Sequence, residues 1–286
     1  MNKIYQYHNS ALRIALWSIM TLLMIIQIDA QRRPKYNDGP YISSNDTSAR
    51  IMWIQEGEKF DTVVSIAENF LFKKKGLPQV DIGDLDFEPD EFRRYENVSK
   101  FIAISDIHGQ HDLFEVLMKA HNVIDEEENW IYGDGHLVIV GDVFDRGDKV
   151  TETLWALFKL EKQAKAAGGK VHLLLGNHEF MIIHGDIRYI NPKYRFTTGS
   201  FGIEYPNLYD QHTVMGRWLR SKNISTVING IGFVHGGYSQ ELLSKESSLK
   251  VLNNTFKEQV IYSEDLDENN DDLLSMLYFD NGPLWF

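Results

Sequence analysis

The 286-residue sequence contains no cysteine, and Asp and Glu outnumber Lys and Arg by enough to give a formal net charge of −12. Without cysteine no disulfide can form, so the hydrophobic core must stabilise the fold unaided. The acidic balance argues against broad binding to nucleic acid or to an anionic membrane, which needs basic surface. It leaves phosphate chemistry open, because bound divalent cations can reverse the local field. The chain also lacks an internal repeat.

Long apolar runs are missing except near the start, where residues 14–26 are apolar and follow Lys3 and Arg13. This stretch is shorter than the roughly 20 residues of a membrane-spanning helix. Because the small residue Ala30 precedes Gln31, the layout predicts a signal peptide over residues 1–30 that is cleaved near Ala30. We therefore expect a secreted or periplasmic protein. There are two alternatives to a signal peptide for this segment. It could be an uncleaved anchor, which would bring the chain to a membrane, or a buried helix.

The pattern over residues 31–98 predicts an N-terminal leader with strands and a helix. We place the domain boundary near Val98. Turn residues at 37–40 precede strand-like patterning over residues 41–54. Apolar residues at helical spacing predict a helix over residues 60–75, followed by an irregular acidic segment over 81–91.

From residue 99 to 286 the pattern is that of an α/β domain. Strands are predicted over 100–105, 137–140 and 170–175, and they alternate with helices over 111–120 and 151–167. The first helix is expected to place Leu113, Phe114, Leu117 and Met118 on one face. Nearly continuous apolar strands separated by helices indicate a largely parallel sheet buried on both faces.

The second half of this domain has weaker signals. Residues 189–209 lack periodicity and read as a long surface excursion, and residues 212–222 as a helix. Residues 225–228 and 231–234 flank Asn229-Gly230, which is a strong hairpin signal. Residues 264–272 read as an acidic, solvated loop.

Three short segments rich in metal-ligating side chains each follow a predicted strand. They are Ser105-Asp106-Ile107-His108-Gly109, Gly141-Asp142-Val143-Phe144-Asp145-Arg146-Gly147 and Gly176-Asn177-His178-Glu179, and His235-Gly236-Gly237 follows the hairpin. Open α/β sheets place their ligands at the carboxyl ends of the strands. Each segment alone could be a turn or a helix cap. Together, in this order, they predict a two-metal phosphoesterase site.

Two divalent ions can generate hydroxide, neutralise charge and hold the attacking oxygen in line with a phosphate ester. Asp106 and His108 alternate in an extended loop, so both can point the same way. Asp142 is the natural bridge, Asn177 offers a neutral oxygen and His235 a nitrogen. This mixed set of nitrogen and oxygen ligands suits Mn, Fe or Zn.

Further residues fit roles in catalysis and substrate binding. His178 could protonate the leaving alkoxide, with Asp145 orienting its ring. Arg146 offers a planar fork for phosphate oxygens, with Asn177 beside it. His184 and His212 flank the 189–209 segment and are secondary candidates near the site.

In these four motifs the chain resembles the calcineurin-like metallophosphoesterases. Within that family it is most similar to the phosphoprotein phosphatase branch, and especially to the bacterial Shewanella-like phosphatases. Looser matches lie at 185–189, at 282–285 and in the leader at 38–41. The resemblance implies a β-sandwich flanked by helices rather than one open sheet. It implies a first metal held by Asp106, His108 and Asp142.

The resemblance further implies a second metal held by Asp142, Asn177 and His235. It implies that His178 is the general acid, that Asp145 is its partner and that Arg146 contacts the phosphate. It also implies that the protein hydrolyses phosphomonoesters, on phosphoserine, phosphothreonine or phosphotyrosine.

The sequence departs from the family pattern in two places. Ser105 stands where a glycine is common, at a position that is not a ligand. The family continues past its Gly-Pro-x-Trp segment with an Arg and a Gly-His segment, whose histidine completes the second metal. The chain is therefore expected to be C-terminally incomplete and one ligand short.

Three alternatives to the intact phosphatase stay open. The chain could be a truncated or weakly active phosphate-binding relative, or a fragment of a longer gene product. It could also be an enzyme that hydrolyses diadenosine polyphosphates, as related folds do.

Overall fold

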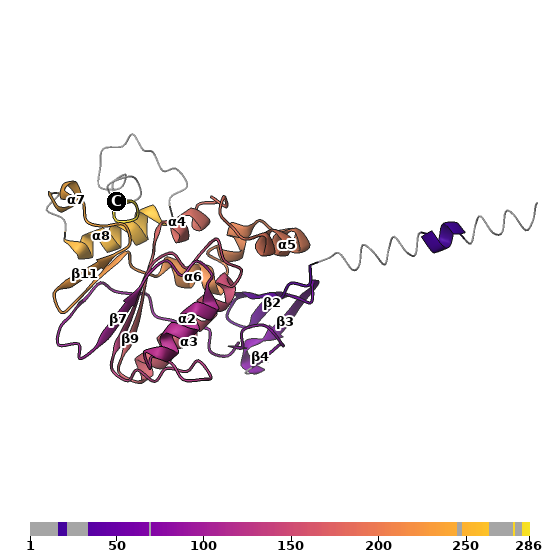
Figure 1. Ribbon diagram of the computed structural model, residues 1–286, viewed down its shortest axis with the longest axis horizontal. Helices are drawn as coiled ribbons and strands as arrows, with labels where there is room; N and C mark the ends of the chain where they lie inside the picture. Colours follow the sequence, from indigo (N-terminus) through magenta and orange to yellow (C-terminus); the bar gives the residue numbers. More distant parts are fainter. Residues whose placement is uncertain (1–16, 22–33, 69, 245–247, 263–276, 278–281) are drawn as a thin grey trace, which may run out of the picture.

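A parallel sheet of β7 (Phe101–Ile104), β8 (His136–Val140) and β9 (Lys170–Leu174) lies at the centre of the computed structural model (Figure 1). Side chains alternate between the two faces of its strands. Along β8, Leu137 and Ile139 point into the main core, beside α2 (His111–Ala120) and α3 (Val150–Ala166), while Val138 points the other way. The predicted strands and helices of this region are confirmed.

A second sheet covers the other face, in the order β11 (Ile231–Val234), β10 (Ser225–Ile228) and β6 (Arg94–Tyr95). Between the sheets, Val138, Leu174 and Ile228 form a separate small core, and the rings of Phe101 and Phe233 meet at 5.7 Å. The two sheets therefore form a sandwich flanked by helices, as the family resemblance implied. The single open sheet expected from the strand–helix alternation alone was wrong, because the hairpin of β10 and β11 folds back over it.

The N-terminal strands β1 (Asp38–Ser44), β2 (Ser48–Gln55) and β3 (Glu58–Ser65) form an antiparallel sheet. The helix predicted over residues 60–75 was wrong. Glu56 and Gly57, with φ of 51° and 81°, make the two-residue turn of a hairpin, and Trp53 stacks on Phe60 at 5.2 Å. The remainder of the predicted helix is η1 (Ile66–Glu68) and β4 (Leu71–Phe72), which pairs with β5 (Val80–Asp81).

Residues 189–209 also differ from expectation, because they contain α5 (Pro192–Phe201) and η2 (Tyr205–Tyr209). The Asn191 side chain caps α5 by accepting a hydrogen bond from the Lys193 N–H at 3.0 Å. Tyr194 and Tyr205 are buried against each other at 5.2 Å. These aromatic residues belong to the core and do not form a surface excursion.

The remaining helices surround the two sheets, and α7 and α8 lie beside β11 in Figure 1. Their bounds are α4 (Asn177–Ile183), α6 (Val214–Arg220), α7 (Gln240–Ser244), α8 (Leu249–Thr255) and η3 (Phe256–Val260).

The buried face of α2 is narrower than expected. His111, Phe114 and Met118 are buried, whereas Leu113 and Leu117 are 57% and 38% exposed. The buried positions follow i, i+3 and i+7 spacing, which is a single stripe along a helix.

The structure describes residues 17–21, 34–68, 70–244, 248–262, 277 and 282–286. Most of the predicted signal peptide, its cleavage position near Ala30 and the acidic loop 264–272 lie outside these residues. Among the residues described, no helix has both the length and the apolar character needed to cross a membrane.

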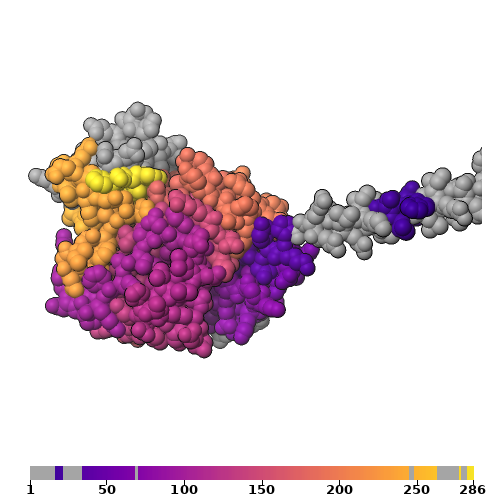
Figure 2. Space-filling view, in the orientation of Figure 1, coloured from indigo at the N-terminus to yellow at the C-terminus, as the bar shows by residue number. Residues whose placement is uncertain are grey.

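The leader is joined to the rest of the chain by a buried carboxylate, that of Asp38 on β1. Its oxygens accept hydrogen bonds from the hydroxyls of Tyr41 at 2.8 Å, Thr151 at 2.9 Å and Thr197 at 2.6 Å. The ammonium of Lys193 lies 3.6 Å away. In Figure 2 the indigo and purple N-terminal strands lie against the orange surface that includes α5. The main core thus spans the boundary predicted near Val98, which stays a prediction.

We expect Asp38→Ala to lower the free energy of unfolding by about 2–5 kcal/mol, because three buried hydroxyls would lose their shared acceptor and the buried ammonium of Lys193 would lose a nearby negative charge. Urea unfolding followed by circular dichroism measures the change. Asp46→Ala, at an exposed turn of the same sheet, is the matched control and should stay within about 0.5 kcal/mol of wild type. Equal stability of the two variants would contradict the anchoring role.

Candidate metal centre

The motif loops at the ends of β7, β8 and β9 are hydrogen-bonded to one another. The N–H of His108 donates to the carbonyl of Asp142 at 2.8 Å, and the N–H of Gly147 donates to the carbonyl of His108 at 2.9 Å. A Cβ atom on Gly147 would lie 2.3 Å from the His108 carbonyl oxygen, and one on Gly176 would lie 2.4 Å from a carboxylate oxygen of Asp142. Only glycine fits at these two contacts, so the loops can approach closely.

Several non-glycine residues of these loops have a left-handed backbone, which side chains other than Asn, Asp and His rarely adopt. They are Asp106, His108, Asp142, Asp145 and Arg146, with φ between 46° and 71°. Each such residue costs on the order of 1–3 kcal/mol unless its surroundings fix it. The hydrogen bonds between the loops supply that constraint.

The carboxylate of Asp142 is buried, and one of its oxygens lies among three histidines. Its Oδ2 is 3.6 Å from Nε2 of His108, 3.3 Å from Nε2 of His235 and 3.8 Å from Nε2 of His178. Nε2 of His108 also lies 3.8 Å from Oδ1 of Asp106, and Nε2 of His235 lies 3.1 Å from Oδ1 of Asn177. The structure thus brings together all five residues predicted to bind metal, with Asp142 between the two sets.

The hydrogen bonds of two of these histidines orient them for metal binding. Nδ1 of His108 faces the carbonyl of Phe144 at 2.7 Å, and Nδ1 of His235 faces the carbonyl of Val140 at 2.8 Å. Each ring therefore carries its proton on Nδ1 when it is neutral, and Nε2 is free to accept. Nε2 of His108 is buried and has no hydrogen-bond partner among the described residues.

An unpartnered buried acceptor beside carboxylates is what a divalent ion would satisfy, and nitrogen and oxygen donors suit Mn, Fe or Zn. The residues therefore fit the predicted ions.

Burial lowers the pKa of His235, but its hydrogen bond to Asp142 and the charge of that carboxylate outweigh this and raise the pKa to about 9. In the metal-free protein His235 is therefore protonated at neutral pH, and a metal ion must displace that proton.

His178 and Asp145 form a close pair in which Nδ1 of the histidine lies 2.5 Å from Oδ2 of the aspartate. Burial lowers the pKa of His178, but the hydrogen bond to Asp145 and the charge of Asp142 raise it by more than burial lowers it. The pKa of His178 is therefore above its ordinary value. A raised pKa lets a histidine hold its proton to higher pH, which favours a role as general acid. Nε2 of His178 also lies 3.8 Å from Oδ2 of Asp142, so the proton on Nε2 would face the metal centre.

Arg146 is exposed at the rim of the centre, and its backbone N–H donates to the carbonyl of Tyr189 at 2.9 Å. His184 and His212 belong to no cluster of ligand atoms in the described part of the chain. His184 instead packs on Phe180, with ring centroids 4.2 Å apart.

Sequence reasoning assigned no role to Glu179, which the structure places directly behind the centre. This side chain is fully buried and accepts hydrogen bonds from the backbone N–H groups of Asp142 at 2.8 Å, Val143 at 2.7 Å, Phe144 at 3.2 Å and Gly176 at 2.8 Å. Burial and the charge of Asp142 raise the pKa of Glu179, and the backbone donors oppose that shift. The signal was available, because a carboxylate in the first turn after a Gly-Asn-His loop can bind backbone N–H groups.

Tyr189 was also missed as an individual residue. Its exposed ring lies 5.5 Å from the ring of His178, and the guanidinium of Arg188 lies 5.5 Å from the Tyr189 ring. Its segment, 185–189, was noted only as a loose family match.

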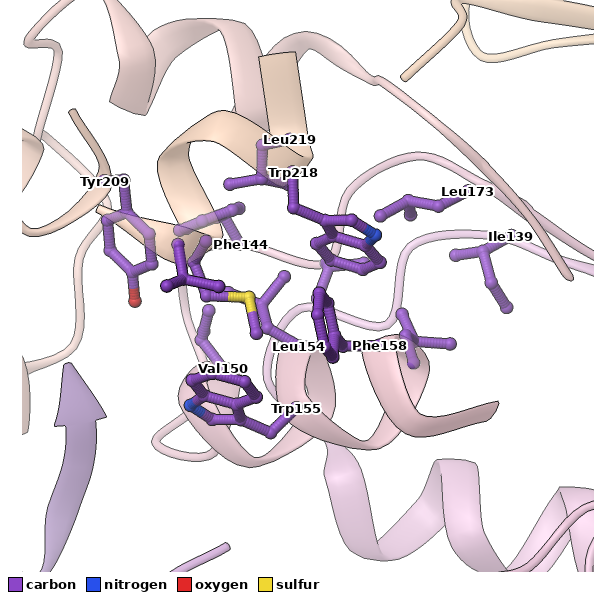
Figure 3. Packing of buried hydrophobic residues seen from close by; sticks show 14 of the residues in the cluster. Ile139, Phe144, Val150, Leu154, Trp155, Phe158, Leu173, Tyr209, Trp218 and Leu219 are labelled. Carbon is purple, nitrogen blue, oxygen red and sulfur yellow. The ribbon is translucent and has the colours of Figure 1, made fainter. Parts of the chain in front are cut away.

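The loop that carries Asp142 and Asp145 is anchored in the main core through Phe144, which is fully buried. The rings of Phe144 and Tyr209 meet edge to face at 4.8 Å, as do those of Phe158 and Trp218 at 5.5 Å (Figure 3). The core thus holds the loop from behind while its polar residues face the centre.

We expect Glu179→Gln to lower the free energy of unfolding by about 2–4 kcal/mol and to weaken metal binding, because an amide NH₂ would face backbone N–H donors that need an acceptor. Thermal unfolding with and without added Mn²⁺ measures both effects. Glu96→Gln makes the same substitution at an exposed position and should leave both unchanged. Wild-type stability and Mn²⁺ binding in Glu179→Gln would show that the loops do not depend on this carboxylate.

The chain belongs to the calcineurin-like phosphoesterase family, whose sequence profile matches residues 99–282. It is 37% identical to the cold-active protein-tyrosine phosphatase of a psychrophilic Shewanella species. Their structures agree with a TM-score of 0.81 over 88% of this chain and 76% of that one. The mixed α/β architecture is therefore the metallophosphoesterase fold of that enzyme.

Two curated relatives are named as Shewanella-like protein phosphatases. The chain is 40% identical over 100 residues to Shewanella-like protein phosphatase 2 of Arabidopsis thaliana, covering 35% of this chain and 26% of that protein. It is 32% identical over 167 residues to Shewanella-like protein phosphatase 1 of Plasmodium berghei, covering 57% and 46%. The chain thus spans less than half the length of these two relatives.

Proposed function

We propose that this protein is a metal-dependent phosphomonoester hydrolase that removes phosphate from phosphorylated proteins or peptides. The observation that carries the proposal is the buried Asp142 carboxylate, whose Oδ2 lies 3.6 Å from Nε2 of His108 and 3.3 Å from Nε2 of His235. Asp142 belongs to two clusters of potential ligand atoms. One buried carboxylate shared by two ligand sets is what a pair of divalent ions needs. The names of the relatives support a protein substrate.

The ions, Mn, Fe or Zn in this proposal, would neutralise the phosphate and lower the pKa of the attacking water. His178 would donate its proton from Nε2 to the leaving oxygen, while Asp145 holds the proton on Nδ1 and so fixes the ring. Arg146 and Asn177 would hold phosphate oxygens, the former through its planar fork. The chemistry suits phosphotyrosine, phosphoserine, phosphothreonine and small phosphoesters alike.

We expect Asp142→Asn to lower kcat/KM for p-nitrophenyl phosphate with added Mn²⁺ by at least about 100-fold, or roughly 2.7 kcal/mol, because the shared anionic ligand is lost. Asp148→Asn makes the same change at an exposed position of the same loop and should retain wild-type activity. Equal activity of the two variants would remove Asp142 from the proposed role.

Metal content per chain tests the same assignment without an activity readout. Wild type loaded with Mn²⁺ and then desalted should retain two ions by elemental analysis, and Asp142→Asn should retain fewer. One ion or none in wild type would favour a weakened phosphate-binding relative. The alternative substrate class needs a separate assay. The kcat/KM values for a diadenosine polyphosphate and for phosphopeptides, measured side by side, identify the preferred substrate.

We also propose that the protein is secreted or periplasmic, on the support of the basic and apolar N-terminal sequence. When the full chain is expressed in a secreting bacterial host, the mature protein should begin at Gln31. N-terminal sequencing of the purified protein measures this, and a chain that begins at Met1 would contradict cleavage.

A further inference from the structure

A hollow of about 630 Å³ opens between the segment that follows α4 and the outer side of α5 and η2. Its walls include the apolar side chains of Ile187, Ile190 and Ile203. Arg195 and Glu204 also line it, so it carries one charge of each sign. A hollow of this size with isoleucine walls suits an apolar side chain better than a charged one.

The hollow lies near the metal centre, because one segment of chain lines the hollow and also contacts a residue of the centre. Ile187 and Ile190 line the hollow, and Tyr189 between them contacts the ring of His178. The carbonyl of Tyr189 also accepts the hydrogen bond from the N–H of Arg146. A polypeptide that reaches the metal centre with a phosphorylated side chain would therefore pass Tyr189 next to the hollow.

Glycines keep the hollow open. Gly185, Gly199 and Gly202 line it, and a Cβ added at any of them would meet no atom within 4 Å. Gly185 and Gly202 have φ of 87° and 70°, which explains glycine at those two positions. Gly199 lies inside α5, where glycine is less favourable than alanine, and no contact requires it. A side chain at Gly199 would instead occupy space at the hollow.

We propose that this hollow is a substrate subsite that binds an apolar side chain of the phosphopeptide, a few residues from the phosphorylated one. The inference rests on the proposed phosphatase function. An extended peptide advances roughly 3.3 Å per residue, so a side chain within about three residues of the phosphorylated one reaches past the Tyr189 ring. Transfer of a leucine side chain from water into the hollow would raise kcat/KM by about tenfold or more.

The first experiment uses the full chain loaded with Mn²⁺ and a set of phosphotyrosine peptides. Each peptide carries one leucine at a different position within three residues of the phosphotyrosine, and serine elsewhere. We expect one position at which leucine raises kcat/KM about tenfold over the all-serine peptide, through a lower KM. Equal kcat/KM for every peptide would overturn the subsite and leave phosphopeptide hydrolysis standing.

The second experiment fills the hollow. In Gly199→Leu, the ratio of kcat/KM for the best leucine peptide to kcat/KM for p-nitrophenyl phosphate should fall about tenfold, and in Gly199→Ala it should fall less. Ser200→Leu adds the same side chain at the next position of α5, which does not line the hollow, and should keep the wild-type ratio. A wild-type ratio in Gly199→Leu would overturn the subsite.

The two proposals fail in different ways. If the wild-type protein hydrolyses p-nitrophenyl phosphate but none of the peptides, both the peptide substrate and the subsite are wrong. If it hydrolyses the peptides, and the ratio of kcat/KM values falls only in the Gly199 variants, both the peptide substrate and the subsite are supported.

Discussion

The carboxylate of Glu179 is the contact on which the arrangement of the centre depends. It accepts backbone hydrogen bonds from two loops that are far apart in sequence, one following β8 and the other following β9. The backbone of Asp142 has a left-handed conformation that an isolated loop would not hold, and this one acceptor fixes the N–H groups of Asp142 and Val143. The shared ligand of the proposed ions is thus positioned by a residue that would not touch them.

The sequence was most informative for the two sheets of the sandwich and for the helix α3. Strands β7, β8 and β9, helix α3 and the hairpin of β10 and β11 were predicted, and so was the set of residues that converges on Asp142. The ligand positions after β7, β8 and β9 were predictable because the carboxyl ends of parallel strands meet at one edge of a sheet. His235 instead follows β11, a strand of the antiparallel hairpin. Convergence of this kind needs no knowledge of side-chain packing.

The failures came where tertiary contacts override local pattern. Apolar residues of β3 happened to repeat at helical spacing, but the turn at Glu56-Gly57 and the stacking of Trp53 on Phe60 place that segment in a sheet. The helix α5 was missed because two of its four buried residues are Lys193 and Thr197, which a hydrophobic pattern does not count. Glu179 was missed because its place in the first turn of a helix indicated only a cap, whereas three of its four partners are backbone N–H groups of the loop after β8.

The anchoring of Asp38 has a consequence for the order of events during synthesis. Its hydroxyl partners on α3 and α5 lie 113 and 159 residues further along the chain. Domains fold as units as the chain emerges, N-terminal parts first. The carboxylate of the first strand nevertheless cannot complete its hydrogen bonds until Thr197 is in place. Until then the carboxylate stays hydrated, and the docking of β1 waits for the segment that forms α5.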